Sequence, residues 1–234
     1  IVIQTFLWNY LYGNSDAAAM TGYSYSQIMV YTLLASMVSH LVYTGFEYQV
    51  NEDIKNGGLN KYLVKPVNYR SYQFFSFLGE KAPQLLILLA VAAALLIFSV
   101  AVLGLMLSFP RVLAFLVSLI LALVLNFFIF YCVALISFWL TDVNLLFGTV
   151  SVVLVVVSGG VFPMDIFGER IAFAVNLLPF GYTTQFPVNI INGRFGLRET
   201  GAGFLCQIFW ICCFGMLAEI LWKRGLKRFT AVGG

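Results

Sequence analysis

The chain has 234 residues, of which 61% are hydrophobic, 17% aromatic and only 10% charged. Soluble domains hold roughly 45–50% apolar residues, so this composition excludes an ordinary soluble globular domain. The net charge of +3 is modest, and we expect no nucleic-acid partner. Because the apolar runs are continuous over about 20 residues rather than alternating, they favour membrane-spanning helices over a β-barrel. We therefore expect an all-α integral membrane protein with a single domain, residues 1–234.

Six apolar runs predict six transmembrane helices, near residues 1–13, 27–46, 83–107, 112–140, 145–162 and 204–222. The first run is too short to cross about 30 Å of hydrocarbon at ~1.5 Å per residue, so we expect the chain to begin partway through its first span. A tight connection at 22–26 should join the first two spans as a hairpin. Pro83 suits a first helical turn. The run 112–140 is longer than a crossing needs, which predicts tilt or a kink near Asn126.

The positive charges predict the orientation. With six crossings, nine of the 13 Lys and Arg residues fall on one side of the membrane and four on the other. Positive charges favour the cytoplasmic side, which would place both termini in the cytoplasm. The nine are Lys55, Lys61, Lys65, Arg70, Lys81, Lys223, Arg224, Lys227 and Arg228; the four are Arg111, Arg170, Arg194 and Arg198.

The most polar connection is "EDIKNGGLNKYLVKPVNY", Glu52 to Tyr69, which we call the polar island. We expect a helix over Phe46–Ile54 that leaves the membrane and stops at the Gly57-Gly58 pair, with its acidic and amide side chains exposed: Glu47, Asn51 and Asp53. A second, amphipathic helix should follow and end at Pro66, with one face formed by Leu59, Tyr62 and Leu63 and the other by Lys61 and Lys65. A solvated connector is the equally weighted alternative. The amphipathic pattern favours a surface that binds a cytoplasmic partner.

A second segment, Phe162 to Gly196, lies on the predicted exterior side. Pro163, Pro179 and Pro187 divide it into apolar pieces of about 10 residues, each half a membrane in length if helical. Short helices at membrane depth are tolerated where protein or a water-filled cavity satisfies their backbone. We expect a re-entrant or interfacial helical hairpin.

Four polar groups lie within or beside the predicted spans: His40, Glu80, Asn126 and Glu219. Glu80 should pair with Lys81 at the cytoplasmic rim, and Glu219 should pair with Lys223 at an (i, i+4) spacing. His40 lies near Ser36, Ser39 and Thr44, which favours interhelical hydrogen bonding over a proton relay.

The sequence shows no catalytic constellation. A single histidine excludes a two-His zinc motif, and we expect no metal site. The four cysteines fall in apolar runs without metal-ligand spacing and are interpreted as small core residues. There is no Gly-rich phosphate-binding loop, so the chain should not hydrolyse ATP on its own. A channel or an ion-coupled secondary transporter is the alternative, but the spans are too apolar to favour it, and a membrane enzyme would need the missing catalytic groups.

Three stretches together resemble the membrane subunits of type-2 ABC exporters, the ABC-2 permeases. The stretch "NEDIKNGGLNKYLVKPVNY" is similar to that family's "I..G.L..YLLKP" segment. The stretch "ISFWLTDVN" resembles a short "FW" signature, and "SGGVFPMDIFGERIAFAVNLLPFGYTTQFPVNIINGR" resembles the family's exterior run of "FP" and "LPF" motifs. Gly168 stands where many members have proline.

The resemblance implies a six-span permease of a bacterial inner membrane that pairs with an identical or homologous permease and works with two cytoplasmic ATPase subunits. ATP and Mg would be bound by those partners, with no cofactor in this chain. The cargo would be a hydrophobic or amphipathic lipid, drug or peptide. The implied coupling-helix residues are Glu52, Asp53, Ile54, Asn56, Gly57, Leu59, Tyr62 and Leu63. The implied exterior re-entrant and gate residues are Phe162, Pro163, Leu178, Pro179, Phe180, Phe186 and Pro187.

Overall fold

The computed structural model describes residues 2–14, 18, 21–103, 109–140 and 142–229, without the side chains of 91, 92, 94–103 and 169. Within these ranges every regular element is a helix. The α-helices are α1 (Val2–Asn14), α3 (Tyr25–Val42), α4 (Phe46–Lys55), α5 (Asn60–Leu63), α6 (Tyr69–Leu103), α7 (Phe109–Leu135), α8 (Asn144–Val157), α9 (Glu169–Asn176), α10 (Gln185–Ile191) and α11 (Leu197–Leu226). Three short 3-10 turns accompany them: η1 (Ile136–Phe138), η2 (Met164–Phe167) and η3 (Phe180–Tyr182).

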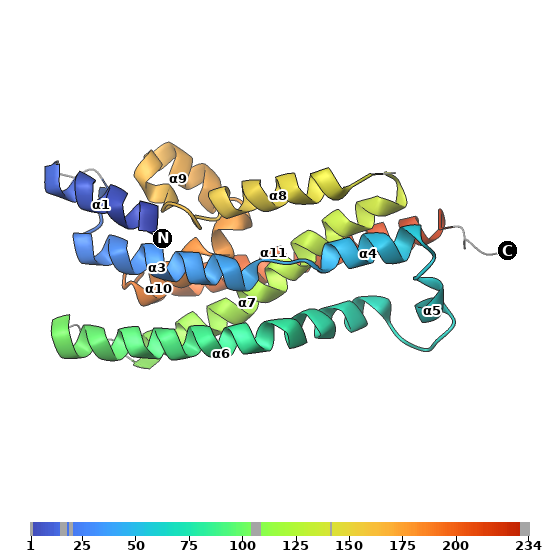
Figure 1. Ribbon diagram of the computed structural model, residues 1–234, viewed down its shortest axis with the longest axis horizontal. Coiled ribbons are helices and arrows are strands. Elements are labelled where there is room, and N and C mark those ends of the chain that lie inside the picture. Colours follow the sequence, from blue (N-terminus) through green and yellow to red (C-terminus); the bar gives the residue numbers. More distant parts are fainter. Residues whose placement is uncertain (1, 15–17, 19–20, 104–108, 141, 230–234) are drawn as a thin grey trace.

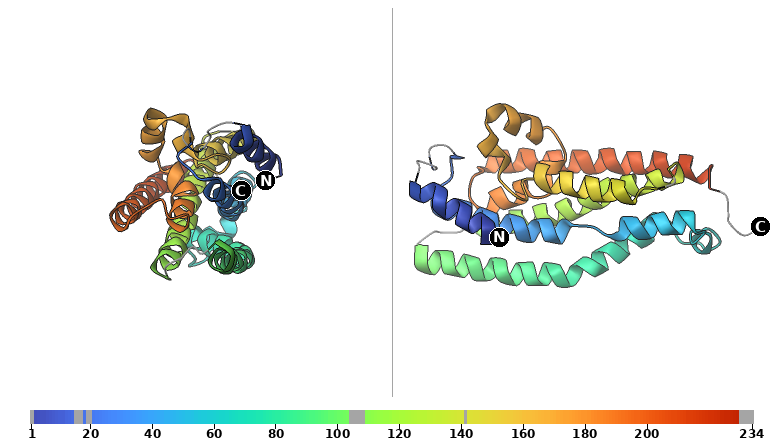
Figure 2. Two further views of the ribbon diagram at one scale, coloured as in Figure 1. Left: turned by 90° about the vertical axis from the view of Figure 1, so that its left-hand side faces the viewer. Right: turned by 45° about the horizontal axis from the view of Figure 1, so that its top comes forward.

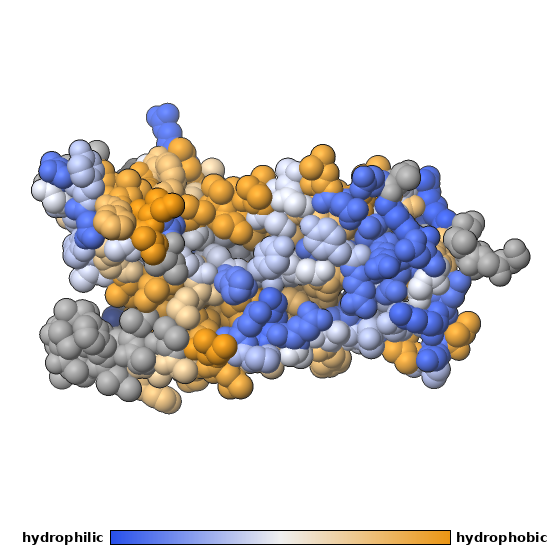
Figure 3. All heavy atoms as spheres, viewed as in Figure 1, coloured by the Kyte–Doolittle hydropathy of each residue, from blue (hydrophilic) through white to orange (hydrophobic). Residues whose placement is uncertain are grey.

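The long helices lie side by side in an elongated bundle (Figure 1). One end of the bundle carries α4, α5 and the C-terminal end of α11, and the other carries α9 and the start of α3. The positively charged residues separate in the same way: Lys55, Lys61 and Lys223 belong to the α4–α5 end, whereas Arg111 and Arg170 lie on elements of the α9 end. Hydrophilic residues also gather over the α4–α5 end, whereas apolar residues are more abundant in the half towards α9 (Figure 3).

Helix α7 is the centre of the bundle. It packs against α11, α10, α4 and α3, and the end-on view in Figure 2 shows the other helices arranged around it. Its buried residues include Phe115, Leu119, Phe127 and Phe130, and such an all-round apolar helix is stable only inside a bundle. The helix runs without interruption through Asn126, and the tilt or kink expected there stays a prediction.

Three helical stretches are long and apolar enough to cross a membrane: 25–55, 109–138 and 197–226. Helix α8 has 14 residues and is shorter than such a span. It ends at Val157, rather than at the predicted residue 162, because the chain turns at Gly159 with a positive φ of 80°. The count of six spans therefore stays a prediction.

The predicted second span, 27–46, is interrupted. Helix α3 starts at Tyr25, where Ser24 forms a capping box with Gln27, and it ends at Val42. The chain is non-helical over 43–45 before α4 begins at Phe46. Helix α1 packs on α3 as expected for a hairpin, and the Tyr12 hydroxyl donates to the Tyr23 carbonyl at 2.7 Å. The predicted connection at 22–26 is too long at its end, because α3 already begins at Tyr25, and a membrane-spanning role for α1 stays a prediction.

The prediction that Pro83 lies in a first helical turn is wrong. Helix α6 begins at Tyr69, where the Asn68 side chain accepts a hydrogen bond from the Ser71 backbone at 3.2 Å, an N-terminal capping geometry. Pro83 lies inside the 35-residue helix, where its ring removes one helical hydrogen bond and favours a bend. Figure 2 shows α6 bent along its length. The predicted turn at 104–111 lies partly outside the described residues, and α7 already begins at Phe109.

Candidate functional site

The polar island is organised around one buried carboxylate, that of Asp53. Only 7% of this residue is exposed. The Tyr69 hydroxyl donates to its Oδ2 at 2.8 Å, and the Lys61 Nζ lies 3.6 Å from its Oδ1. Gln73 donates to the same Tyr69 oxygen at 2.9 Å. This network joins α4, α5 and the first turn of α6, so the three elements form one structural unit.

The Gly-Gly pair closes this unit. Gly57 has a φ of 75°, which glycine adopts without strain and which ends α4 as predicted. A Cβ atom on Gly58 would lie 2.4 Å from the Asp53 Oδ1, so only glycine fits there. The Leu59 backbone N–H then donates to the Asp53 carbonyl at 2.9 Å. The pair therefore lets the chain fold back over Asp53.

The expectation that the acidic and amide side chains of α4 are exposed is wrong. Glu47, Asn51 and Asp53 are all buried, because α4 packs on α7, η1 and α8 instead of standing free in solvent. Neither carboxylate oxygen of Glu47 has a hydrogen-bond partner among the described residues.

The predicted amphipathic helix is also shorter than expected. Helix α5 covers only Asn60–Leu63 and ends before Pro66. Leu59 is fully buried whereas Leu63 is 47% exposed, so these two do not share one face. Tyr62 lies between them and packs edge-on against the Tyr69 ring, with centroids 4.9 Å apart.

The candidate coupling residues consequently include a buried group and an exposed group, with Gly57 and Tyr62 half-buried between them. Asp53, Ile54 and Leu59 are buried beneath the surface. The exposed group consists of Glu52, Asn56 and Leu63, next to Val64, which is 82% exposed. We call Glu52, Asn56, Leu63 and Val64 the docking face.

Helix α4 seats the island on the bundle through aromatic contacts. The Phe46 ring stacks on Phe127 of α7 with centroids 4.8 Å apart. The Tyr48 ring packs edge-on against Phe147 of α8 at 5.2 Å. A displacement of α4 would therefore also displace α7 and α8, because close-packed interfaces transmit shifts instead of absorbing them.

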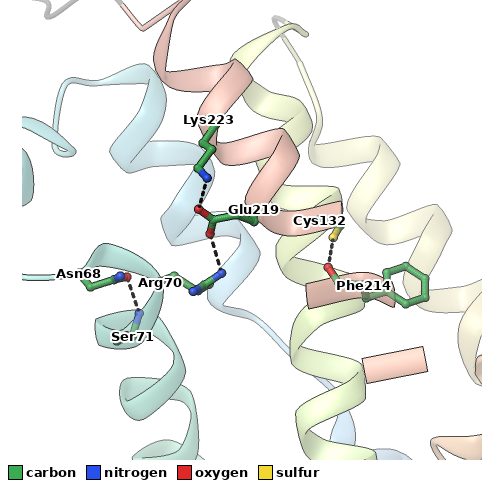
Figure 4. Close-up of polar contacts among 7 residues, drawn as sticks. All are labelled: Asn68, Arg70, Ser71, Cys132, Phe214, Glu219 and Lys223. Atoms are coloured by element: carbon green, nitrogen blue, oxygen red, sulfur yellow. Dashed lines mark hydrogen bonds and ion pairs between the residues drawn. The ribbon is translucent and has the colours of Figure 1, made fainter. Parts of the chain in front are cut away.

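Charged residues join the start of α6 to the end of α11 (Figure 4). The Arg70 Nη1 lies 2.9 Å from the Glu219 Oε2, and the Lys223 Nζ lies 3.2 Å from the other oxygen. The predicted Glu219–Lys223 pair is thus confirmed, and Arg70 completes it. The predicted Glu80–Lys81 pair is not seen among the described residues. The Lys81 ammonium instead donates to Gln84 at 3.1 Å.

Burial changes the acid–base behaviour of the Tyr69 phenol. Burial, and then the adjacent Asp53 carboxylate, raise the pKa of Tyr69 far above its usual value of 10.0. Removing the proton would place two negative charges beside each other in a poorly hydrated site. The phenol therefore stays a hydrogen-bond donor to Asp53 throughout the physiological range.

The two candidate intramembrane polar residues differ. Asn126 is fully buried, and its amide nitrogen donates to the Val42 carbonyl at the end of α3, next to the interruption at 43–45. Asn126 lines a small cavity together with Ser39, Ser151 and Thr184, and its amide oxygen has no hydrogen-bond partner among the described residues. His40 instead is exposed and lines a groove between α3 and α6. No hydrogen bond joins it to another described residue, so the expected interhelical bond is not seen.

A third membrane-depth polar residue, Gln207, was missed by sequence reasoning. It is fully buried, and its amide nitrogen donates to the Ser118 carbonyl at 3.1 Å and to the Tyr182 carbonyl at 2.9 Å. It thereby ties α11 to α7 and η3. A lone glutamine in an apolar run was the available signal, because buried amides in membranes are hydrogen-bonded across helices.

The segment 162–196, which was predicted to lie on the exterior side, is built from short helices, as its prolines predict. Pro163 and Pro179 directly precede η2 and η3, and Pro187 lies in the first turn of α10, where its missing N–H is tolerated. Helices α9 and α10 have only 8 and 7 residues. Whether this arrangement re-enters a membrane stays a prediction.

The candidate gate residues occupy different environments. Phe186 is buried and packs against Tyr182, Phe195 and Phe204. Phe162 packs edge-on against Trp8 of α1 at 5.9 Å. Phe180 is half-buried against the core, and Leu178 is exposed. The structure therefore does not bring these side chains together at one point.

A polar network that the sequence did not predict fixes the segment 162–196 to the connection that precedes α3. The buried Tyr23 hydroxyl donates to Asp165 at 2.9 Å, and Gln185 donates to the other Asp165 oxygen at 3.1 Å. The Arg194 guanidinium lies 3.9 Å from the centroid of the Tyr23 ring. Burial, followed by the Asp165 carboxylate, raises the pKa of Tyr23, so its hydroxyl stays a donor. The partners are far apart in sequence and carry no common motif, which is why the pattern gave no signal.

The fold and these sites define a class: a polytopic helical membrane protein whose most polar surface is at one end of an apolar bundle. A family model described as "ABC-2 family transporter protein" matches residues 1–233. The chain belongs to the ABC-2 transporter family. No curated protein and no solved structure matches it in the comparisons made.

Proposed function

We propose that the chain is the permease subunit of an ATP-driven exporter, that it pairs with a second permease, identical or homologous, and that two separate cytoplasmic ATPases bind ATP and Mg. The exported compound would be hydrophobic or amphipathic, such as a lipid, a drug or a peptide. The α4–α5 end would face the cytoplasm of a bacterial cell, in line with its positive charges. Family membership supports the transporter part of this proposal.

One observation carries the assignment of the ATPase contact. The docking face exposes two aliphatic side chains, Leu63 and Val64, beside polar groups at the most hydrophilic end of the bundle (Figure 3). Exposed apolar side chains rimmed by polar residues are typical of protein interaction sites. Beneath that face, Asp53 and Leu59 hold the three elements together, so we assign them a supporting role and assign binding to the docking face.

The structure also suggests how movement would spread. An ATPase that moved the docking face would move α4, which is separated from α3 by the non-helical residues 43–45 and packs on α7 and α8. Such interruptions are typical hinges. We propose that α4 tilts about this hinge and that α1, α3 and α8 change between inward-facing and outward-facing arrangements. The segment 162–196, held by the Tyr23–Asp165 network, would close the exterior end.

The experiment is a pull-down of the tagged chain from its native membrane in mild detergent. An ATPase with nucleotide-binding motifs should co-purify with the wild type and be lost with Leu63→Asp/Val64→Asp. Leu197→Asp is the matched control: Leu197 is 91% exposed but lies at the start of α11, at the opposite end of the bundle. No ATPase on the wild-type chain, or equal recovery with both variants, would contradict the proposal.

A further inference from the structure

A groove between α3 and α6 is unexplained by the ATPase contact. It has a volume of about 480 Å³, within the range of small-molecule sites, and is lined by Ser36, Met37, His40, Leu41, Gln84, Ile87 and Leu88. It lies beside the last turn of α3, on the half of the bundle that leads to α4 (Figure 1). A lipid in the leaflet on the α4–α5 side would meet it from the side.

The polar end of the groove offers hydrogen-bond donors. The Gln84 oxygen accepts from Lys81, which leaves the amide NH₂ as its free polar group. His40 is exposed and carries at least one ring N–H. The Ser36 hydroxyl is directed to the Thr32 carbonyl at 2.8 Å. The ligand that matches this set has several acceptor oxygens in one head group.

The positive charge of Lys81 beside this end of the groove also favours a ligand with acceptor oxygens. The Lys81 ammonium donates to Gln84 at 3.1 Å, and the residue as a whole is only 9% exposed. Glu80 and Glu47 both interact with it electrostatically, but neither forms an ion pair with it among the described residues, and the Glu47 carboxylate is fully buried. Lys81 itself does not line the groove, so its charge acts from behind Gln84. A phosphate is therefore an acceptor group that Gln84 and His40 can bind with a positive charge nearby.

The other end of the groove is aliphatic. Met37, Leu41 and Leu88 form its walls, and Ile87 and the adjacent Leu86 are 62% and 68% exposed, so the groove opens towards acyl chains. Donors at one end and an aliphatic opening at the other match an amphipath with a phosphate head. We propose that this groove binds a glycerophospholipid of the leaflet on the α4–α5 side, with its phosphate at His40 and Gln84 and its chains along Ile87. This inference depends neither on the ATPase contact nor on the identity of the exported compound.

The test uses the full chain in lipid nanodiscs and photoreactive lipids that carry a diazirine on one acyl chain. One probe is a phosphatidylglycerol, and the other is the diacylglycerol with the same chains and no phosphate. Mass spectrometry of peptides gives the labelling of α3 and α6 relative to the lipid-exposed Val152 and Val153 of α8, which serve as an internal control. We expect the phospholipid to label the groove about tenfold above this control, the change expected from two hydrogen bonds, and the diacylglycerol to show no preference.

Two variants test the donors. His40→Leu/Gln84→Leu should abolish the preference for the phospholipid. Gln84→Glu keeps the side-chain size but replaces the donor by a negative charge, so it should have the same effect and gives the answer if the double variant does not fold. Equal labelling by both lipids, or a preference retained in Gln84→Glu, would show an ordinary lipid-covered surface. Displacement of the phospholipid by excess inorganic phosphate would show an anion site instead, and would also overturn the proposal.

Discussion

The hydroxyl of Tyr69 donates a 2.8 Å hydrogen bond to the carboxylate of Asp53, and both residues are almost completely buried. Sixteen positions separate the two residues in the sequence. The bond joins the helix that leaves the bundle, α4, to the helix that returns to it, α6. The loop between them is therefore held from within, and its outer residues are free to bind a partner.

Tyr69→Phe should destabilise the polar island. The change removes the donor but keeps the ring, which stacks on Trp222 at 5.4 Å, so the buried carboxylate loses one of its two partners. The expected loss is about 1–3 kcal/mol, measured as a fall in the thermal midpoint of the purified protein in detergent. Tyr10→Phe, at an exposed position of α1, should change the midpoint little. An equal effect of both substitutions would contradict the role of the bond.

The same bond predicts a dependence on alkaline pH. Because the pKa of Tyr69 is raised in the folded protein, its stabilising contribution is complete below pH 10.0 and is lost above it, where the unfolded chain releases the proton first. The difference in midpoint between the wild type and Tyr69→Phe should be constant from pH 7 to pH 9 and shrink above pH 10. A difference that grows with pH would have the wrong sign.

The local signals in the sequence predicted the elements of the island, but burial depended on tertiary packing. The Gly57-Gly58 stop needed only backbone conformation, and it is confirmed. The burial of Glu47, Asn51 and Asp53 depends on where α4 rests, which is decided by Phe127 and Phe147 from distant helices. A polar sequence pattern considered by itself predicts that side chains are exposed to solvent. For this reason the prediction for these three residues was wrong.

The start of α6 shows the same limit. Pro83 is a strong signal for a first helical turn, but Asn68 provides a competing cap one residue before Tyr69, and the charged pair of Arg70 with Glu219 helps hold the additional turns against α11. In the segment 162–196, the prolines correctly predicted short helices. The Tyr23–Asp165 network joins positions 142 residues apart, and no local pattern encodes such a contact.

Two glycines on α11 should respond in opposite ways to alanine. A Cβ atom on Gly203 would lie 1.9 Å from the Phe186 ring, whereas Gly201 has open space around it. Gly201→Ala should leave stability unchanged or raise it by about 0.5–1 kcal/mol. Gly203→Ala should lower it by about 1–3 kcal/mol through overpacking. Thermal midpoints of the two variants, measured in the same detergent, provide a matched comparison.

Phe186→Leu should partly rescue Gly203→Ala, since the smaller side chain leaves space for the added methyl group. The two changes would then be non-additive, as expected for residues in contact. Strict additivity of the two changes would show that the cost of Gly203→Ala does not come from the Phe186 ring.

Gln207→Leu should separate η3 from the bundle more than it unfolds α11. The substitution keeps the approximate volume but removes the donors to Ser118 and Tyr182, leaving two buried carbonyls without those partners. Single hydrogen bonds between membrane helices contribute about 0.6 kcal/mol on average, so the loss should be about 1–3 kcal/mol once the unpaired carbonyls are included. Hydrogen exchange should rise over residues 180–191 while the centre of α11 stays protected. Met216→Leu, at an exposed position of the same helix, is the control, and uniform exchange along α11 in Gln207→Leu would contradict a local role for this residue.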